Sequence, residues 1–331
     1  MTTFRTLPKG RKARIVVLDD YMGVARNLAN WSILEDRAEV TFLKYAIRPE
    51  DLPSQLAEYD AICLLRERTD LSKSVLQALP NLKAIAATGR QTRTLDSDAA
   101  NALGIPVMTT DGSGNGIYAT VELAWGLILG LMRHIPAESA GMRDRAWQMR
   151  LGNALYGRTL GLVGLGKLGS RMALVAQAFG MNIIAWSPNL TSERAEKGGA
   201  SYVDKDTLFC TADIISLHLV LGPSTKGIVA MEDFARMQSH ALFINTSRGP
   251  LVDSEALLAA LKGGQIGGAG LDVYDQEPLP ADAAIRKTPN TLLTPHLGYS
   301  VKETFESFYS QTVENLDCWL DGSLRRLASK N

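Results

Sequence analysis

Residues 159–180 read TLGLVGLGKLGSRMALVAQAFG, and this stretch decides the fold class of the chain. The apolar run 159–163 has the composition of a buried strand, and it leads directly into the glycines of 164–169. Apolar residues then recur at helical spacing from Leu168 to Phe179, before Gly180 ends the helix. The stretch therefore predicts a strand, a tight turn and a helix.

The spacing of the glycines in this unit predicts a dinucleotide site. Gly164 permits the turn, Gly166 lets a pyrophosphate approach the backbone, and Gly169 lets the helix and strand pack closely. Free amides at the start of the helix then face the anion. The alternative is a glycine-rich turn without a ligand, which the surrounding strand and helix disfavour.

Composition limits the class of protein. The 331 residues suit two domains, and a hydrophobic content of 46% is ample for two cores. Lys plus Arg equals Asp plus Glu at 35 each, so we expect no nucleic-acid or membrane partner. The three cysteines, Cys63, Cys210 and Cys318, lie far apart without a CxxC pair, which predicts neither disulfides nor a metal site. No signal-peptide core or apolar run of membrane-spanning length occurs, so we expect a soluble, cytoplasmic protein.

Short apolar runs alternate with longer helical patterns along the whole chain, which is typical of parallel α/β sheets. The first series of expected strands comprises 14–18, 40–43, 61–65, 83–87 and 105–108. The second series comprises 160–163, 182–186, 213–217, 241–245, 268–271 and 291–293. We therefore expect an α/β protein with two doubly wound parallel-sheet domains.

A polar segment, DGSGNG at 111–116, separates the two series and is followed by an apolar helix over 117–135. The GxG spacing of this segment also fits a phosphate loop, but without a preceding strand and turn a hinge is favoured. Because the helix is apolar nearly all round, it must be buried on several sides. A homodimer interface and burial between the domains of a monomer both remain open.

The last helical pattern, 302–320, follows the final strand of the second series. If this helix crosses back onto the first domain, that domain is discontinuous. Its boundaries are then 1–112 with 303–331, and the dinucleotide-binding domain comprises 113–302.

Ligands of open parallel sheets bind beyond the carboxyl ends of the strands. In the second series the polar residues at these ends, or in the loops that follow, are His218, Thr246, Ser247, Arg248, Asp272, Glu277 and His296. An arginine, a carboxylate and a histidine that converge on a nicotinamide can support hydride transfer. Of the four histidines, His134 lies near a helix end and His240 precedes a strand. The residues alone leave His218 and His296 open as the acid/base.

The second half of the chain resembles the D-2-hydroxyacid dehydrogenase family, which includes phosphoglycerate, glyoxylate/hydroxypyruvate and D-lactate dehydrogenases. Four motifs carry the resemblance: GLVGLGKLG at 161–169, NTSRGPLVD at 245–253, LDVYDQEP at 271–278 and TPHLG at 294–298. Weaker similarity reaches back through LRERT at 65–69 and Leu95-Asp96. The resemblance implies a Rossmann NAD-binding domain and a flavodoxin-like substrate domain. It also implies that the chain has no C-terminal regulatory domain, since only about 35 residues follow His296.

The resemblance implies hydride transfer between a nicotinamide and a small 2-oxo or D-2-hydroxy acid. Arg248 would bind the substrate carboxylate, which the bidentate geometry of a guanidinium suits. His296 would be the acid/base, and Glu277 would orient its ring and stabilise its charged form. The alternative is an NAD(H)-sensing interaction protein on the same scaffold, as the corepressor relatives of the family are.

The resemblance extends to binding residues. The implied cofactor-binding residues are Gly164, Gly166, Lys167, Leu168, Gly169, Ser187, His218, Thr246, Ser247, Asp272 and Gly298. The implied substrate-binding residues are Arg66, Gly89, Arg90 and Gln91. The loop TGRQTRT at 88–94 departs from the glycine-rich VGxGxDN of the family. Its two arginines either recognise a second anionic group or are solvated loop charges.

A second departure concerns the cofactor. Ser187 stands where an acidic residue normally binds the ribose hydroxyls and repels a 2′-phosphate. No arginine or lysine follows until Arg194. We therefore expect NAD with relaxed selectivity, so that NADP is a second candidate.

Overall fold

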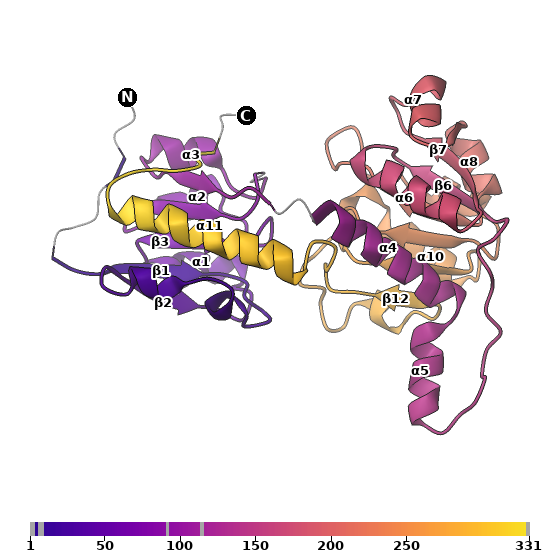
Figure 1. Cartoon of the computed structure of the whole chain (residues 1–331), viewed down its shortest axis with the longest axis horizontal. Coiled ribbons are helices and arrows are strands. Elements are labelled where there is room, and N and C mark those ends of the chain that lie inside the picture. The colour runs from indigo at the N-terminus through magenta and orange to yellow at the C-terminus, as the bar shows by residue number, and fades with distance from the viewer. Residues whose placement is uncertain (1–3, 6–9, 91–92, 113–115, 329–331) are drawn as a thin grey trace. The chain divides into compact units, whose positions relative to one another are not determined.

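The computed structural model describes residues 4–5, 10–90, 93–112 and 116–328 (Figure 1). These residues fall into two compact units. The first belongs to Met1–Asn115 and Val301–Asn331, and the second to Gly116–Ser300. Each unit contains one parallel β-sheet with helices, so the predicted α/β class is confirmed.

The first unit has a five-stranded sheet in the order β2-β1-β3-β4-β5, which is the flavodoxin-like order. Its strands are β1 (Ala13–Val17), β2 (Ala38–Phe42), β3 (Ala61–Leu64), β4 (Ala84–Ala87) and β5 (Val107–Thr109). Its helices are α1 (Leu52–Leu56), α2 (Lys73–Gln77), α3 (Ser97–Ala102) and α11 (Lys302–Leu320). Every residue of β3 and β4 is buried, as continuous apolar runs in a sheet covered on both faces require.

Helix α11 packs on the first unit although it follows the second in sequence (Figure 1). Its buried face includes Phe305 and Tyr309, and the Tyr309 ring lies 6.3 Å from that of Trp31. The buried Asn315 donates from Nδ2 to the carbonyl of Thr109 at 2.9 Å. The first unit is therefore built from two separate parts of the sequence.

The second unit has a seven-stranded parallel sheet in the order β12-β11-β10-β9-β6-β7-β8, which is the Rossmann order. Its strands are β6 (Thr159–Val163), β7 (Asn182–Trp186), β8 (Ser201–Tyr202), β9 (Ile214–Leu217), β10 (Leu242–Asn245), β11 (Gly268–Leu271) and β12 (Thr291–Leu293). Its helices are α4 (Gly116–Met132), α5 (Ile135–Arg143), α6 (Lys167–Ala178), α7 (Ser192–Lys197), α8 (Lys205–Thr211), α9 (Met231–Arg236) and α10 (Ser254–Lys262). Strand β8 is not among the predicted strands, because two exposed residues carry no periodic signal.

The sequence predicts one helix over 117–135, and the structure contains two helices instead. Helix α4 ends at Met132, His134 adopts a left-handed backbone with φ 55°, and α5 begins at Ile135. Pro136 explains the break, because a proline cannot continue a helix but fits the first turn of a new one. In the part of the chain that the structure describes, no helix has the length and apolar character needed to cross a membrane.

Candidate active site

The glycine loop between β6 and α6 has the geometry of an anion cradle. Gly164 has φ 103°, and a Cβ there would lie 2.9 Å from the carbonyl carbon of His218. A Cβ at Gly169 would lie 2.2 Å from the Gly164 oxygen, so this position also requires glycine. A Cβ at Gly166, in contrast, would meet nothing within 4 Å. Open space therefore adjoins the backbone where the first helical amides, of Lys167 and Leu168, have no partner within the helix.

Two enclosed polar atoms lie at the ends of β9 and β10. The amide of His218 donates to Val163 O at 2.8 Å and its Nε2 contacts Ser216 Oγ at 2.8 Å, while Nδ1 is buried without a partner. Thr246 Oγ1 is likewise buried and unpartnered. Burial lowers the pKa of His218 to about 4, so its ring is neutral at pH 7. Because buried polar atoms normally have partners, these two fit contacts with a bound ligand such as NAD.

Ser187 and Ser247 lie at the same sheet edge, after strands β7 and β10, which β6 and β9 separate. The Gly164 amide donates to Trp186 O at 2.8 Å, so the half-buried Ser187 follows the end of β7 directly beside the glycine loop. Ser247 donates its hydroxyl to Leu219 O at 2.5 Å, so this hydroxyl holds two loops together. The cofactor roles of both serines remain predictions.

His296 and Glu277 form a close pair. His296 Nδ1 lies 2.5 Å from Glu277 Oε2, and the Tyr274 amide donates to Glu277 Oε1 at 3.0 Å. The two side chains are 21% and 28% exposed, so solvent reaches them only partly. His296 has φ 56°, a left-handed backbone that the surrounding loop must hold in place. Since Nδ1 faces the carboxylate, Nε2 is the atom that can exchange a proton with a substrate.

Asp272 binds the loop that leads to and follows His296. Its side chain is fully buried, and its oxygens accept from Thr294 Oγ1 at 2.6 Å and from the amides of Leu297 and Gly298 at 2.7 and 2.9 Å. Burial raises the pKa of Asp272, while these donors and the nearby His296 oppose the shift. Asp272 therefore shapes the loop that carries His296, and the Gly298 amide takes part in the same set of hydrogen bonds. The cofactor roles of Asp272 and Gly298 remain predictions.

Arg248 follows β10 in a turn held by the side chain of Asn245. Asn245 Nδ2 donates to Arg248 O at 3.0 Å, and the Arg248 guanidinium donates to Ser247 O at 2.7 Å. At the next residue, a Cβ on Gly249 would lie 2.1 Å from the carbonyl carbon of Tyr274. The backbone next to Arg248 is therefore in direct contact with the segment that leads to Glu277.

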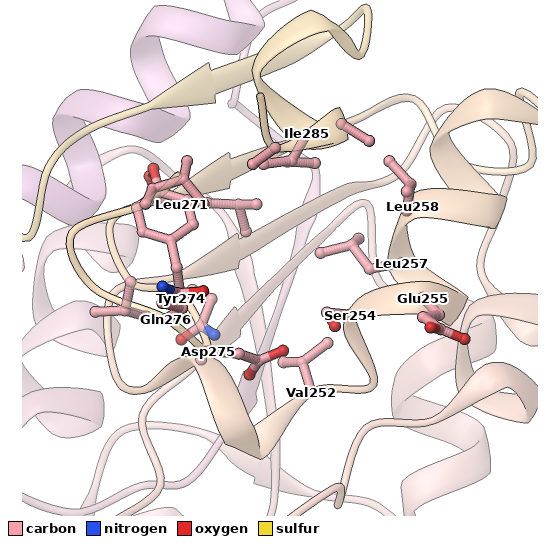
Figure 2. A pocket seen from close by; sticks show the side chains of 16 residues that line it. Val252, Ser254, Glu255, Leu257, Leu258, Leu271, Tyr274, Asp275, Gln276 and Ile285 are labelled. Atoms are coloured by element: carbon pink, nitrogen blue, oxygen red, sulfur yellow. The ribbon is translucent and has the colours of Figure 1, made fainter. Parts of the chain in front are cut away.

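Tyr274 joins the ends of β11 and β12 at this edge, a role that its place in the sequence does not predict. Its hydroxyl lies 3.1 Å from Leu271 O and 3.0 Å from Thr294 O, two residues before His296. Figure 2 shows Tyr274 on the wall of a cavity of about 260 Å³ that α10 closes on the other side. The available signal was an aromatic hydroxyl inside the 271–278 motif, but its partners are carbonyls that no sequence pattern identifies.

The predicted substrate-binding residues lie in the first unit. The Arg66 amide donates to Thr88 Oγ1 at 2.8 Å, and a Cβ on Gly89, which has φ 81°, would lie 2.1 Å from Arg66 Nη1. Arg90 Nε pairs with Asp111 at 2.7 Å. Gln91 lies outside the described residues. The structure thus brings Arg66 and Gly89 together and gives Arg90 an acidic neighbour.

Comparison with known proteins places these residues in context. Residues 125–298 match the family model of the D-isomer specific 2-hydroxyacid dehydrogenase, NAD binding domain, and this match confirms the predicted use of NAD. A D-3-phosphoglycerate dehydrogenase of Synechocystis sp. is 39% identical over 88% of the chain and 51% of its own length. A hydroxypyruvate reductase of Thermotoga maritima is 35% identical over 86% of the chain and 92% of its own length.

Solved structures are similar over nearly the whole chain. A phosphoglycerate oxidoreductase from Vibrio cholerae has a TM-score of 0.87 at 36% identity and covers 94% of this chain and 100% of its own. The D-lactate dehydrogenase of Escherichia coli has a TM-score of 0.76 at 28% identity and covers 96% of this chain and 100% of its own. The chain spans about half the length of the curated relatives named D-3-phosphoglycerate dehydrogenase.

Proposed function

Because the chain belongs to the D-isomer specific 2-hydroxyacid dehydrogenase family, we propose that it transfers a hydride between NAD and a small D-2-hydroxy acid or its 2-oxo acid. The contact of 2.5 Å between His296 Nδ1 and Glu277 Oε2 carries the proposal. Reduction of a carbonyl requires a proton donor beside the hydride donor, and a histidine oriented by a carboxylate fills this role near neutral pH.

Each residue has a distinct task in the proposed reaction. A bound nicotinamide cofactor supplies or accepts the hydride. Arg248 binds the substrate carboxylate through two parallel hydrogen bonds and polarises the adjacent carbonyl. His296 Nε2 gives its proton to the carbonyl oxygen during reduction and takes it back during oxidation. Glu277 accepts from Nδ1, which fixes the ring and stabilises its charged form.

A panel of 2-oxo acids with NADH, followed by nicotinamide absorbance, tests the proposal. We expect oxidation of NADH with at least one of glyoxylate, pyruvate, hydroxypyruvate and phosphohydroxypyruvate. Arg248→Lys should raise the KM for that acid, whereas Arg236→Lys, on the exposed end of α9, should leave it unchanged. Failure of the folded protein to reduce any 2-oxo acid would contradict the proposed function.

We further propose that the chain forms a homodimer, with the interface moved from the predicted helix to the segment after it. The apolar side chains of α4 are largely taken up by the core of its own unit. The following segment exposes Met142, Trp147, Leu151 and Tyr156, at 56%, 75%, 95% and 82%. Exposed apolar groups of this density mark an association surface. Light scattering should give a molar mass of twice that of the chain. In the double variant Trp147→Glu, Leu151→Glu the molar mass should fall to that of a single chain. A monomeric wild-type protein refutes the proposal.

A further inference from the structure

The loop after β7 carries a positive charge where dinucleotide sites that select NAD carry a negative one. Ser187 follows the last residue of β7, and the Ser187 carbonyl accepts from the Leu190 amide at 3.1 Å, which closes a tight turn over 187–190. Arg194 of α7 reaches back to this turn, where its Nη1 donates to Asn189 O at 2.8 Å. The turn therefore holds a hydroxyl and a guanidinium but no carboxylate.

The end of α7 contacts the glycine loop, and Arg194 lies one helical turn before that end. A Cβ on Gly198 would lie 2.5 Å from Leu165 Cδ2, so this end of the helix touches the loop of 164–166. The Gly198 amide still donates to Arg194 O at 3.1 Å, so Arg194 lies one helical turn earlier on the same face. Buried Leu190 and Ala195 anchor the turn and the helix in the core of the unit.

The charges around Arg194 do not neutralise it. Across the described residues, no carboxylate lies within 4.0 Å of its guanidinium. The adjacent Glu193 pairs with Lys197 at 2.7 Å, so the charge of this carboxylate is already balanced, and Glu196 is the other acid on the helix. A guanidinium has five N–H donors, and the bond to Asn189 O occupies one of them.

We propose that this turn is a binding site for the 2′-phosphate of a phosphorylated dinucleotide, so that the chain accepts NADP as well as NAD. The inference rests on the proposed function only in requiring that the glycine loop binds a dinucleotide. The ribose of a bound dinucleotide lies at the end of the second strand of a Rossmann unit, which is the position of Ser187. The Ser187 hydroxyl and the Arg194 guanidinium both donate to phosphate oxygens, and no acid at position 187 repels them.

Binding of two nucleotides that lack nicotinamide tests the site without turnover. Calorimetry compares 2′,5′-ADP with 5′-AMP on the full chain, and we expect the wild-type protein to bind 2′,5′-ADP at least as tightly as 5′-AMP. Arg194→Gln should weaken 2′,5′-ADP by about tenfold, the loss expected for a charge-assisted contact, and leave 5′-AMP within about twofold. Ser187→Asp should weaken 2′,5′-ADP by at least about tenfold through repulsion, without weakening 5′-AMP.

Lys262→Gln is the matched control, because it removes a positive charge from the exposed end of α10 in the same unit, away from the turn and from Glu193. It should leave both affinities unchanged. If the wild-type protein binds 5′-AMP more tightly than 2′,5′-ADP, or if Arg194→Gln weakens the binding of both nucleotides equally, the 2′-phosphate site is refuted. Neither result contradicts the proposed dehydrogenase function. If neither nucleotide nor NADH binds, the dinucleotide site and the proposed function both fail.

Discussion

Gly249→Ala should impair the active site without changing any residue that touches substrate. The added Cβ would lie 2.1 Å from the carbonyl carbon of Tyr274 and 2.5 Å from the Asp275 nitrogen, whereas ordinary contact begins at 3.4 Å. The neighbour is backbone, so the peptide must move by about 1 Å, and the Tyr274 amide that binds Glu277 moves with it. A misplacement of about 1 Å lowers turnover by about 100-fold.

The stability cost of this substitution should be smaller than its effect on turnover. Overpacking costs about 1–3 kcal/mol, and the cavity of Figure 2 next to Tyr274 and Asp275 gives the peptide room to move. Steady-state kinetics, thermal unfolding and NADH binding should therefore show a large loss of kcat, a small loss of Tm and an unchanged Kd. Gly222→Ala is the control, because its Cβ would meet only Thr225 Oγ1 at 4.0 Å. A Gly249→Ala variant with kcat within about threefold of wild type, well short of the expected loss, refutes the reasoning.

Three further predictions address the acid/base pair, its support and the first unit. His296→Ala should lower kcat by about 100-fold or more and leave the Kd of NADH nearly unchanged. His240→Ala, at the opposite edge of the sheet, is the control and should retain turnover. A large loss of NADH binding in His296→Ala would mean that His296 is misassigned. Tyr274→Phe removes the hydroxyl that donates to the carbonyls of Leu271 and Thr294, so it should lower the unfolding free energy by about 1 kcal/mol. Because Thr294 lies two residues before His296, the loss of this bond should also shift the position of His296 and alter the pH profile of kcat. An unchanged pH profile would leave Tyr274 a purely structural residue. Asp60 is fully buried between Arg11 and Lys83. Burial by itself raises the pKa of Asp60, but the hydrogen bonds from Arg11, the Arg14 amide and Lys83 lower it overall, so Asp60→Asn should destabilise the first unit by roughly 3 kcal/mol at pH 7. The folded-state pKa of Asp60 lies below its unfolded value of about 3.9, so the stabilisation by the ionised carboxylate is complete above about pH 3.9 and is lost as the pH falls through the folded-state pKa. Denaturation experiments in which wild type and Asp60→Asn differ by a constant unfolding free energy down to about pH 2 contradict this prediction.

The sequence predicts the fold well where periodicity is strong. Strands β7, β11 and β12 and helix α11 have the predicted bounds, because each is an uninterrupted apolar run or a helical pattern between clear breaks. The sequence does not predict the break between α4 and α5, because the apolar pattern continues as far as Ile135 and favours a single helix despite Pro136. The two residues of strand β8 form a strand only because they pair with β7, so their own sequence does not predict it.

The candidate site is predictable in its residue types but not in its connections. The motifs identify His296 and Glu277, and these two side chains are in contact. The partly buried hydrogen bond from Thr294 to Asp272 joins residues that are 22 positions apart, and its direction depends on how both loops fold. Sequence spacing places Asp272 at the cofactor edge but cannot tell whether its carboxylate turns toward a ligand or toward its own backbone.

The fate of the hydride tests the central claim most directly. A 2-oxo acid that supports turnover and forms a chiral product is reduced with NADH that carries deuterium at both C4 positions of the nicotinamide, and the product is analysed by mass spectrometry and chiral chromatography. The account predicts a D-2-hydroxy acid with one deuterium at C2, and at least about 100-fold slower formation of this product in His296→Ala. A product without deuterium, or with the L configuration, contradicts it.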